Sequence, residues 1–182
     1  MSFVLKTDKK RKGFTLVEIL VVIGILLLLS PVIMSPIRDA FERTYMARAL
    51  AEFRSFETAL YIYLMDHDEY PEDEVRDMPA DLVKFLPPGE WPKAPWPGSV
   101  YDWDNWNSDG EHIVQITIRF CPQHGTINDC RFPRQDWAED FDVNSGVFYC
   151  IKGECRSHKT ENLDYPGYCV NCPENHPPYG FD

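Results

Sequence analysis

The sequence lacks the short motifs that mark the commonest catalytic sites. It contains no G-x-S-x-G elbow, no H-E-x-x-H pair and no glycine-rich P-loop pattern. Its five histidines are scattered through segments rich in loop-forming residues. These absences favour a structural or binding protein over an enzyme, and we predict no catalytic residue.

Basic residues are scarce outside the N-terminus. The formal net charge is -11, yet residues 1–13 hold five Lys or Arg and one Asp, so the remainder carries -15. A body this acidic argues against a protein that binds nucleic acid through its phosphates. It is typical of a solvated surface, and it can also recruit divalent cations.

Cysteine is absent from the first two thirds of the chain. The last third holds six: Cys121, Cys130, Cys150, Cys155, Cys169 and Cys172. An even, clustered set favours disulfide bonds in an oxidising compartment, and we predict that sequence neighbours pair. The alternative is a zinc site, for which Cys150-x4-Cys155 and Cys169-x2-Cys172 have acceptable spacing.

Charge is also nearly absent from residues 14–36, where Glu18 is the exception. As a helix, these 23 residues measure about 34 Å, enough to cross about 30 Å of hydrocarbon. The basic cluster before them predicts a cytoplasmic N-terminus, with residues 37–182 outside. A carboxylate costs about 2.5–3.5 kcal/mol at the centre of a span, so Glu18 is a candidate functional residue.

A cleaved secretory signal is the alternative interpretation of this segment. Such a signal needs a small-x-small site just after its apolar core. Here these triplets occur only at residues 47–51, inside a patterned helix. Gly13, before the apolar core, is the better processing point, and cleavage there leaves the apolar segment on the mature chain.

Glycine and proline are missing from residues 37–70, and apolar residues recur there every three or four positions. This period predicts an amphipathic helix that continues the first one to about residue 66. Pro31 and Pro36 predict a kink or a locally melted turn at residues 28–36. The apolar positions are Ile37, Phe41, Tyr45, Ala49, Phe53, Phe56, Leu60 and Leu64.

Residues 67–182 have the composition of a small globular domain. Alternating apolar and polar residues predict strands at 99–103, 112–120 and 146–151, after one helical turn at 80–85. The segment YDWDNWNSDG offers alternating oxygen ligands for calcium in Asp102, Asp104, Asn107 and Asp109. It is not an EF-hand, because Ile116 falls at the bidentate Glu position. A polar turn is the alternative.

At residues 12–18, KGFTLVE, the chain resembles the type IV pilin and type II secretion pseudopilin family. This stretch is similar to the family's prepilin-peptidase signature. Residues 59–71, ALYIYLMDHDEYP, resemble the family's helix exit, and Pro95-Trp96 with Gly98 and Tyr101 is similar to a Pro-Trp-Gly…Tyr piece of major pseudopilins.

The resemblance implies a processing and assembly pathway. A membrane aspartyl peptidase, the prepilin peptidase, is expected to cut between Gly13 and Phe14, and Phe14 is then N-methylated. An inner-membrane assembly platform lifts subunits from the lipid bilayer into a filament of copies and related pilins. Glu18 is expected to meet the new amine of Phe14 on a neighbouring copy, which offsets the cost of a lone carboxylate.

We therefore predict an α+β fold: a long N-terminal helix packed by its second half on a small antiparallel sheet, with a disulfide-rich, irregular C-terminal region. The expected parts are a leader (1–13), a transmembrane and filament-core helix (14–36), an amphipathic continuation (37–66) and an extracytoplasmic domain (67–182).

Three functions follow from this prediction. The first is a type II secretion pseudopilin, favoured by the Pro-Trp piece and the Asp/Asn-rich segment. The second is a type IV pilus subunit for adhesion, motility or DNA uptake, favoured by the cysteine-rich tail. The third, from another class, is a membrane-anchored calcium- or carbohydrate-binding domain that never polymerises.

Overall fold

The computed structural model describes residues 13–87, 89–108, 110–153, 155 and 166–172, with only the backbone described at residues 30–35 and 108. The main elements are α1 (Leu16–His67), η1 (Ala80–Phe85), β1 (Val100–Ser108), β2 (Glu111–Arg119), β3 (Gly146–Lys152) and β4 (Tyr168–Cys169). The short helical turns η2 (Ile127–Asp129) and η3 (Asp136–Ala138) lie between β2 and β3. The predicted α+β fold is confirmed.

Helix α1 is continuous from Leu16 to His67. Its end agrees with the predicted end near residue 66. Of the kink or locally melted turn predicted at residues 28–36, the melted turn is wrong, since the backbone there is helical. Each proline removes one backbone donor, and the bonds of the adjoining turns maintain the helix.

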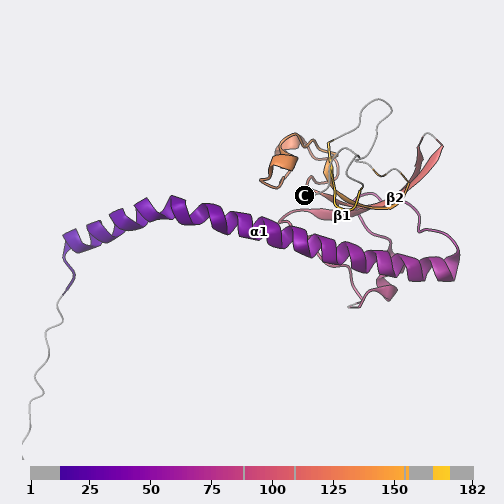
Figure 1. The fold of residues 1–182 in the computed structure, drawn as a ribbon, viewed down its shortest axis with the longest axis horizontal. Helices are drawn as coiled ribbons and strands as arrows, with labels where there is room; N and C mark the ends of the chain where they lie inside the picture. Colours follow the sequence, from indigo (N-terminus) through magenta and orange to yellow (C-terminus); the bar gives the residue numbers. More distant parts are fainter. Residues whose placement is uncertain (1–12, 88, 109, 154, 156–165, 173–182) are drawn as a thin grey trace, which may run out of the picture. The chain divides into compact units, whose positions relative to one another are not determined.

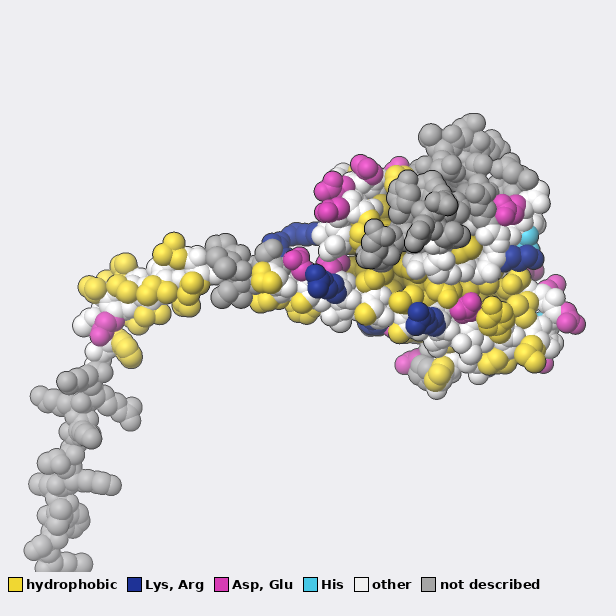
Figure 2. Space-filling model, viewed as in Figure 1, with side chains coloured by type: hydrophobic (Ala, Val, Ile, Leu, Met, Phe, Trp, Pro, Cys, Tyr) yellow, Lys and Arg dark blue, Asp and Glu magenta, His cyan; other side chains and the backbone are white. Residues whose placement is uncertain are grey.

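The chain divides into two compact units, Met1–Phe41 and Glu42–Asp182. In the first unit the described apolar side chains of α1 are exposed, for example Leu16 at 78% and Leu28 at 76%. Figure 2 shows hydrophobic side chains along this part of the helix. Among the residues that the structure describes, no helix combines the length and apolar character needed to cross a membrane. The span predicted at residues 14–36 is thus not shown.

The second unit is a helix packed on a sheet. The strands lie in the order β1-β2-β3-β4, and the first three are antiparallel neighbours. The two-residue strand β4 runs parallel to β3, so the predicted antiparallel sheet has one parallel edge. The last part of α1 covers one face of this sheet (Figure 1).

Aromatic side chains form the contact between α1 and the sheet. Phe53 and Phe56 are 0% and 1% exposed. Phe56 meets the edge of Tyr101, with ring centroids 4.9 Å apart, and Phe53 stacks on Tyr149 at 5.5 Å. From Ala49 onward, the predicted apolar face of the helix is therefore the buried face, whereas Ile37 and Phe41 of the same predicted face are exposed.

Hydroxyl and indole groups add polar bonds along the same contact. Trp96 Nε1 donates to Glu42 Oε2 at 2.7 Å. Tyr149 donates its hydroxyl to Glu57 Oε2 at 2.8 Å, and Tyr101 donates to Glu52. Burial and the hydrogen bond to Glu57 raise the pKa of Tyr149 to about 12.

Candidate functional site

The predicted processing point lies just before α1. Gly13 and Phe14 are non-helical and exposed, with 83% of the Phe14 surface accessible. A Cβ added at Gly13 would meet no atom within 4 Å. Since neither packing nor positive φ requires glycine here, the fold does not explain its identity. The bond between these residues is open to a protease.

Thr15 and Glu18 form a capping box at the start of the helix. The Thr15 N–H and Oγ1 donate to Glu18 Oε2 at 2.8 and 2.9 Å, and the Glu18 N–H donates to Thr15 Oγ1 at 3.3 Å. The exchange satisfies backbone donors that have no partner inside the helix. Among the described residues, both bonds to the carboxylate fall on Oε2 and none on Oε1.

Thr15 is a residue that the sequence interpretation missed. The signal was present, because Thr-x-x-Glu before an apolar run is the pattern of a capping box. Glu18 was predicted to act toward a neighbouring copy. The structure adds that the same carboxylate already stabilises the start of its own helix.

The carboxylates predicted to bind calcium are placed differently. Residues 102–107 belong to strand β1 and do not form a loop. Asp102 and Asp104 share the sheet face opposite α1, whereas Asn107 points to the other face because strand side chains alternate. Asp109 lies outside the described residues. Asn107 is therefore not brought together with Asp102 and Asp104.

Arg119 supplies the positive charge for this pair of carboxylates. Its Nε lies 2.6 Å from Asp102 Oδ2, and its second terminal nitrogen lies 3.3 Å from Asp104 Oδ1. The side chains of Arg119, Asp102 and Asp104 are only 4%, 8% and 7% exposed. A buried guanidinium thus occupies the place where a cation was expected.

Further hydrogen bonds complete the cluster. Asp104 Oδ2 accepts from Gln115 Nε2 at 3.0 Å and from the Thr117 hydroxyl at 2.5 Å. The Arg76 N–H donates to Asp102 Oδ1 at 2.6 Å. Buried charges are stable only when such bonds satisfy their remaining lone pairs.

The guanidinium groups of Arg119 and Arg76 also form hydrogen bonds with the connection between β2 and β3. Arg119 donates to the carbonyl of Asn144, and Arg76 donates to the carbonyls of Cys121 and Val143. These bonds join the start of residues 120–145 to Arg76, and their end to Arg76 and to Arg119 of β2. The cluster is therefore a structural anchor for this connection.

The pKa shifts in the cluster follow from one guanidinium facing two carboxylates. Burial raises the pKa of Asp102, and the charge of Asp104 raises it further, while Arg119 partly offsets both effects. Burial alone would lower the pKa of Arg119, but the two carboxylates raise it. Arg119 therefore stays charged. Among the described residues, no three His, Cys, Asp or Glu side chains are grouped to hold a metal, and calcium binding stays an untested prediction.

All six cysteines are paired. The structure joins Cys121 to Cys130, Cys150 to Cys155 and Cys169 to Cys172, which are the neighbour pairs expected from the sequence. With their sulfurs in disulfides, these cysteines have no thiolates for the zinc site considered as the alternative. The first bridge follows β2, the second joins Cys150 of β3 to Cys155 just after the strand, and the third includes Cys169 of β4.

Two comparisons find similar proteins. A family model described as "Prokaryotic N-terminal methylation motif" matches residues 8–30. The chain is 31% identical over 98 residues to "Type II secretion system core protein G" of Pectobacterium carotovorum subsp. carotovorum. The alignment covers 45% of this chain and 63% of that relative, less than two thirds of its length. No solved structure matches the chain significantly.

The methylation motif covers the signature, the processing point and the capping box, and the relative is itself a secretion-system component. The chain is thus similar to proteins with a prokaryotic N-terminal methylation motif and to a core protein of a type II secretion system.

Proposed function

We propose that this chain is a structural subunit of a pilus-like filament, a pseudopilin of a type II secretion system. Prepilin peptidase cleaves between Gly13 and Phe14, and the Phe14 amine is methylated. The observation that carries the proposal is the start of α1. There an exposed glycine with no structural reason to be glycine precedes a capped helix whose apolar side chains are uncovered.

The exposed apolar half of α1 needs a partner outside the monomer. Burying apolar surface contributes about 25 cal/mol per Å², so the side chains of residues 14–29 cannot stay in water at equilibrium. In the proposal the inner-membrane bilayer covers them first, with the N-terminus inside. Copies of the chain and related pilins cover them later, when the assembly platform moves the subunit into the filament.

Glu18 sets the register of assembly in this proposal. The new Phe14 amine of a neighbouring copy carries the charge that complements the carboxylate. Because Thr15 uses Oε2, the other oxygen is the one available to that amine. One carboxylate can thus cap its own helix and receive a neighbour.

Mass spectrometry of the mature N-terminus tests the proposal. We expect N-methyl-Phe14 in protein purified from cells that carry a prepilin peptidase and a type II secretion system. An intact Met1 in those cells contradicts it. Gly13→Val is expected to block processing without changing the fold of residues 42–182, which circular dichroism and the disulfide content check.

Two substitutions distinguish the role of Glu18 as a helix cap from the role of its negative charge in assembly. Glu18→Gln keeps an oxygen that can accept the Thr15 bonds, whereas Thr15→Ala removes the cap and keeps the charge. If the charge sets the register, Glu18→Gln lowers the yield of sheared filaments at least about tenfold, and Thr15→Ala lowers it much less. Equal losses in both variants would reduce the role of Glu18 to capping.

A further inference from the structure

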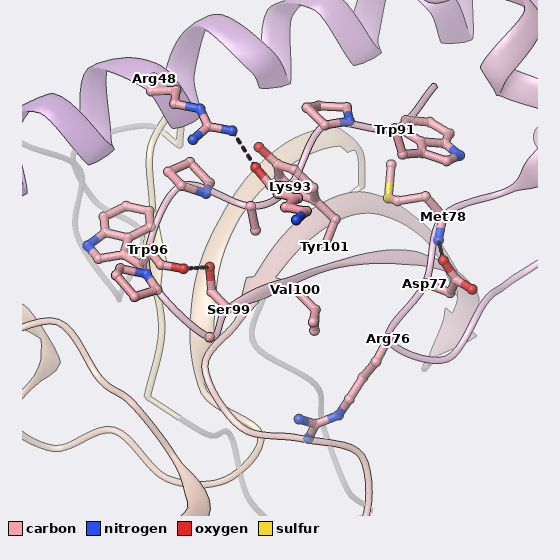
Figure 3. Close-up of a pocket in the computed structure, with 15 residues that line it drawn as sticks. Arg48, Arg76, Asp77, Met78, Trp91, Lys93, Trp96, Ser99, Val100 and Tyr101 are labelled. Carbon is pink, nitrogen blue, oxygen red and sulfur yellow. Dashed lines mark hydrogen bonds between the residues drawn. The ribbon is translucent and has the colours of Figure 1, made fainter. Parts of the chain in front are cut away.

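A groove lies on the globular unit beside the middle of α1. It has a volume of about 500 Å³. We call it the Pro-Trp groove, and its walls are the loop of residues 91–99, residues 76–78 and 100–101, and Arg48 of α1. Figure 3 shows Arg48 reaching from the helix to the main-chain carbonyl of Lys93.

The walls of the Pro-Trp groove are basic in an otherwise acidic protein. They carry Arg48, Arg76 and Lys93 against one carboxylate, Asp77, whereas the whole chain has a net charge of -11. Arg48 is fixed by Glu52 and Arg76 by main-chain carbonyls. Lys93 is exposed, and no ion pair of its ammonium is found among the described residues. Charge complementarity therefore favours an acidic partner in the groove, and Lys93 is the residue expected to form an ion pair with that partner.

The same chain carries a matching acidic surface. The acidic turn, residues 66–74, starts in the last two residues of α1 and has six carboxylates and no Lys or Arg. Asp66, Asp68, Glu69 and Glu72 are exposed. Tyr70 and Pro71 face inward, so this turn presents mainly charge.

The two surfaces are far apart within one copy. Arg48 and Asp66 are eighteen residues apart on α1, which corresponds to about 27 Å along the helix axis. A parallel copy displaced by about this distance brings its acidic turn to the groove. The contact is heterologous, joining different surfaces of the two copies, and repetition of such a contact builds an open filament.

We propose that the Pro-Trp groove binds the acidic turn of a second copy of this chain. The inference rests on the proposed filament function and adds a contact between globular units to the one made by the helices. Lys93 pairs with a carboxylate of the neighbour, and the Arg48 bond holds the loop that presents Lys93.

Zero-length carbodiimide cross-linking of assembled, full-length filaments tests the contact. Filaments made from mixed ¹⁴N- and ¹⁵N-labelled subunits distinguish bonds between copies from bonds within one copy. We expect mixed-label peptides that join Lys93 to the acidic turn. Lys84, which is also exposed and lies over the Phe85 ring, is the matched control and is expected to form none.

Charge exchange supplies the second measurement. Lys93→Glu places like charges together, and we expect at least about a tenfold loss of filament yield. Lys93→Gln is expected to give a smaller loss, and Glu69→Lys is expected to restore part of the yield of Lys93→Glu. Thermal unfolding and disulfide content of the purified variants confirm that they fold.

The outcomes separate this contact from the proposed function. Two results would contradict the contact: a normal filament yield from Lys93→Glu, or cross-links from Lys93 only to sites outside the acidic turn. Neither result would contradict the proposed filament function. If the wild-type chain forms no filaments and keeps Met1, the function fails, and the contact fails with it.

Discussion

The two halves of α1, residues 16–41 and 42–67, share one secondary structure and differ in what covers them. In the first half the described apolar side chains are mostly half exposed or more, and in the second Phe53, Phe56 and Leu60 are at most 1% exposed. A helix that is apolar all round needs lipid or other helices, whereas an amphipathic helix needs one partner face. The second half is therefore covered by its own chain, and in the proposed function other molecules cover the first half.

Substitution of one apolar residue in each half tests this contrast most strongly. Phe53→Ala removes a fully buried ring, and we expect it to lower the free energy of unfolding by about 4 kcal/mol. Leu20→Ala, at a side chain 64% exposed in the monomer, is expected to change it by less than about 0.5 kcal/mol. Denaturant titration of the full chain in detergent measures both. A similar loss from Leu20→Ala would show that the first half contributes to the monomer fold.

The second prediction concerns the sheet face that α1 does not cover. Arg119→Met leaves Asp102 and Asp104 buried without their guanidinium, and we expect a loss of about 3 kcal/mol near pH 7. Burial already raises the pKa of Asp102, and removing the guanidinium raises it further. Protonation of Asp102 therefore relieves the destabilisation of the variant as the pH falls. Denaturant titrations at several pH values should show that the difference in the free energy of unfolding between the variant and the wild type decreases as the pH falls. Arg54→Met, on the exposed side of α1, is the control. A difference between Arg119→Met and wild type that stays constant with pH would contradict the ion-pair explanation.

The smallest effect is expected from the polar bonds between the sheet and the second half of α1. The folded-state pKa of Tyr149 is raised to about 12, above the unfolded value of about 10. Its stabilisation is full below the unfolded pKa and is lost as the pH rises from about 10 to 12. The free energy of unfolding of Tyr149→Phe should therefore decrease less steeply than that of the wild type over this pH range.

Most elements could be predicted because their patterns are local. The absence of glycine and proline between residues 37 and 70 predicted the extent of α1, and alternation predicted β2 and β3. Strand β1 was predicted too short because Asp and Asn are unfavourable in strands. Arg119, on the adjacent strand, compensates the Asp residues. The two-residue strand β4 has no pattern long enough to recognise.

The sequence by itself determined the processing signature and the extent of the helix, since both depend on residues near one another in the chain. It also carried the Thr-x-x-Glu pattern of the capping box, which the sequence interpretation missed. It also predicted that the apolar segment 14–36 needs lipid or other helices to cover it. Only the tertiary structure decided that Asp102 and Asp104 pair with Arg119, and that Arg48 and Lys93 meet in a basic groove. Those groups are distant in the chain, and their charges interact strongly only after folding buries or juxtaposes them.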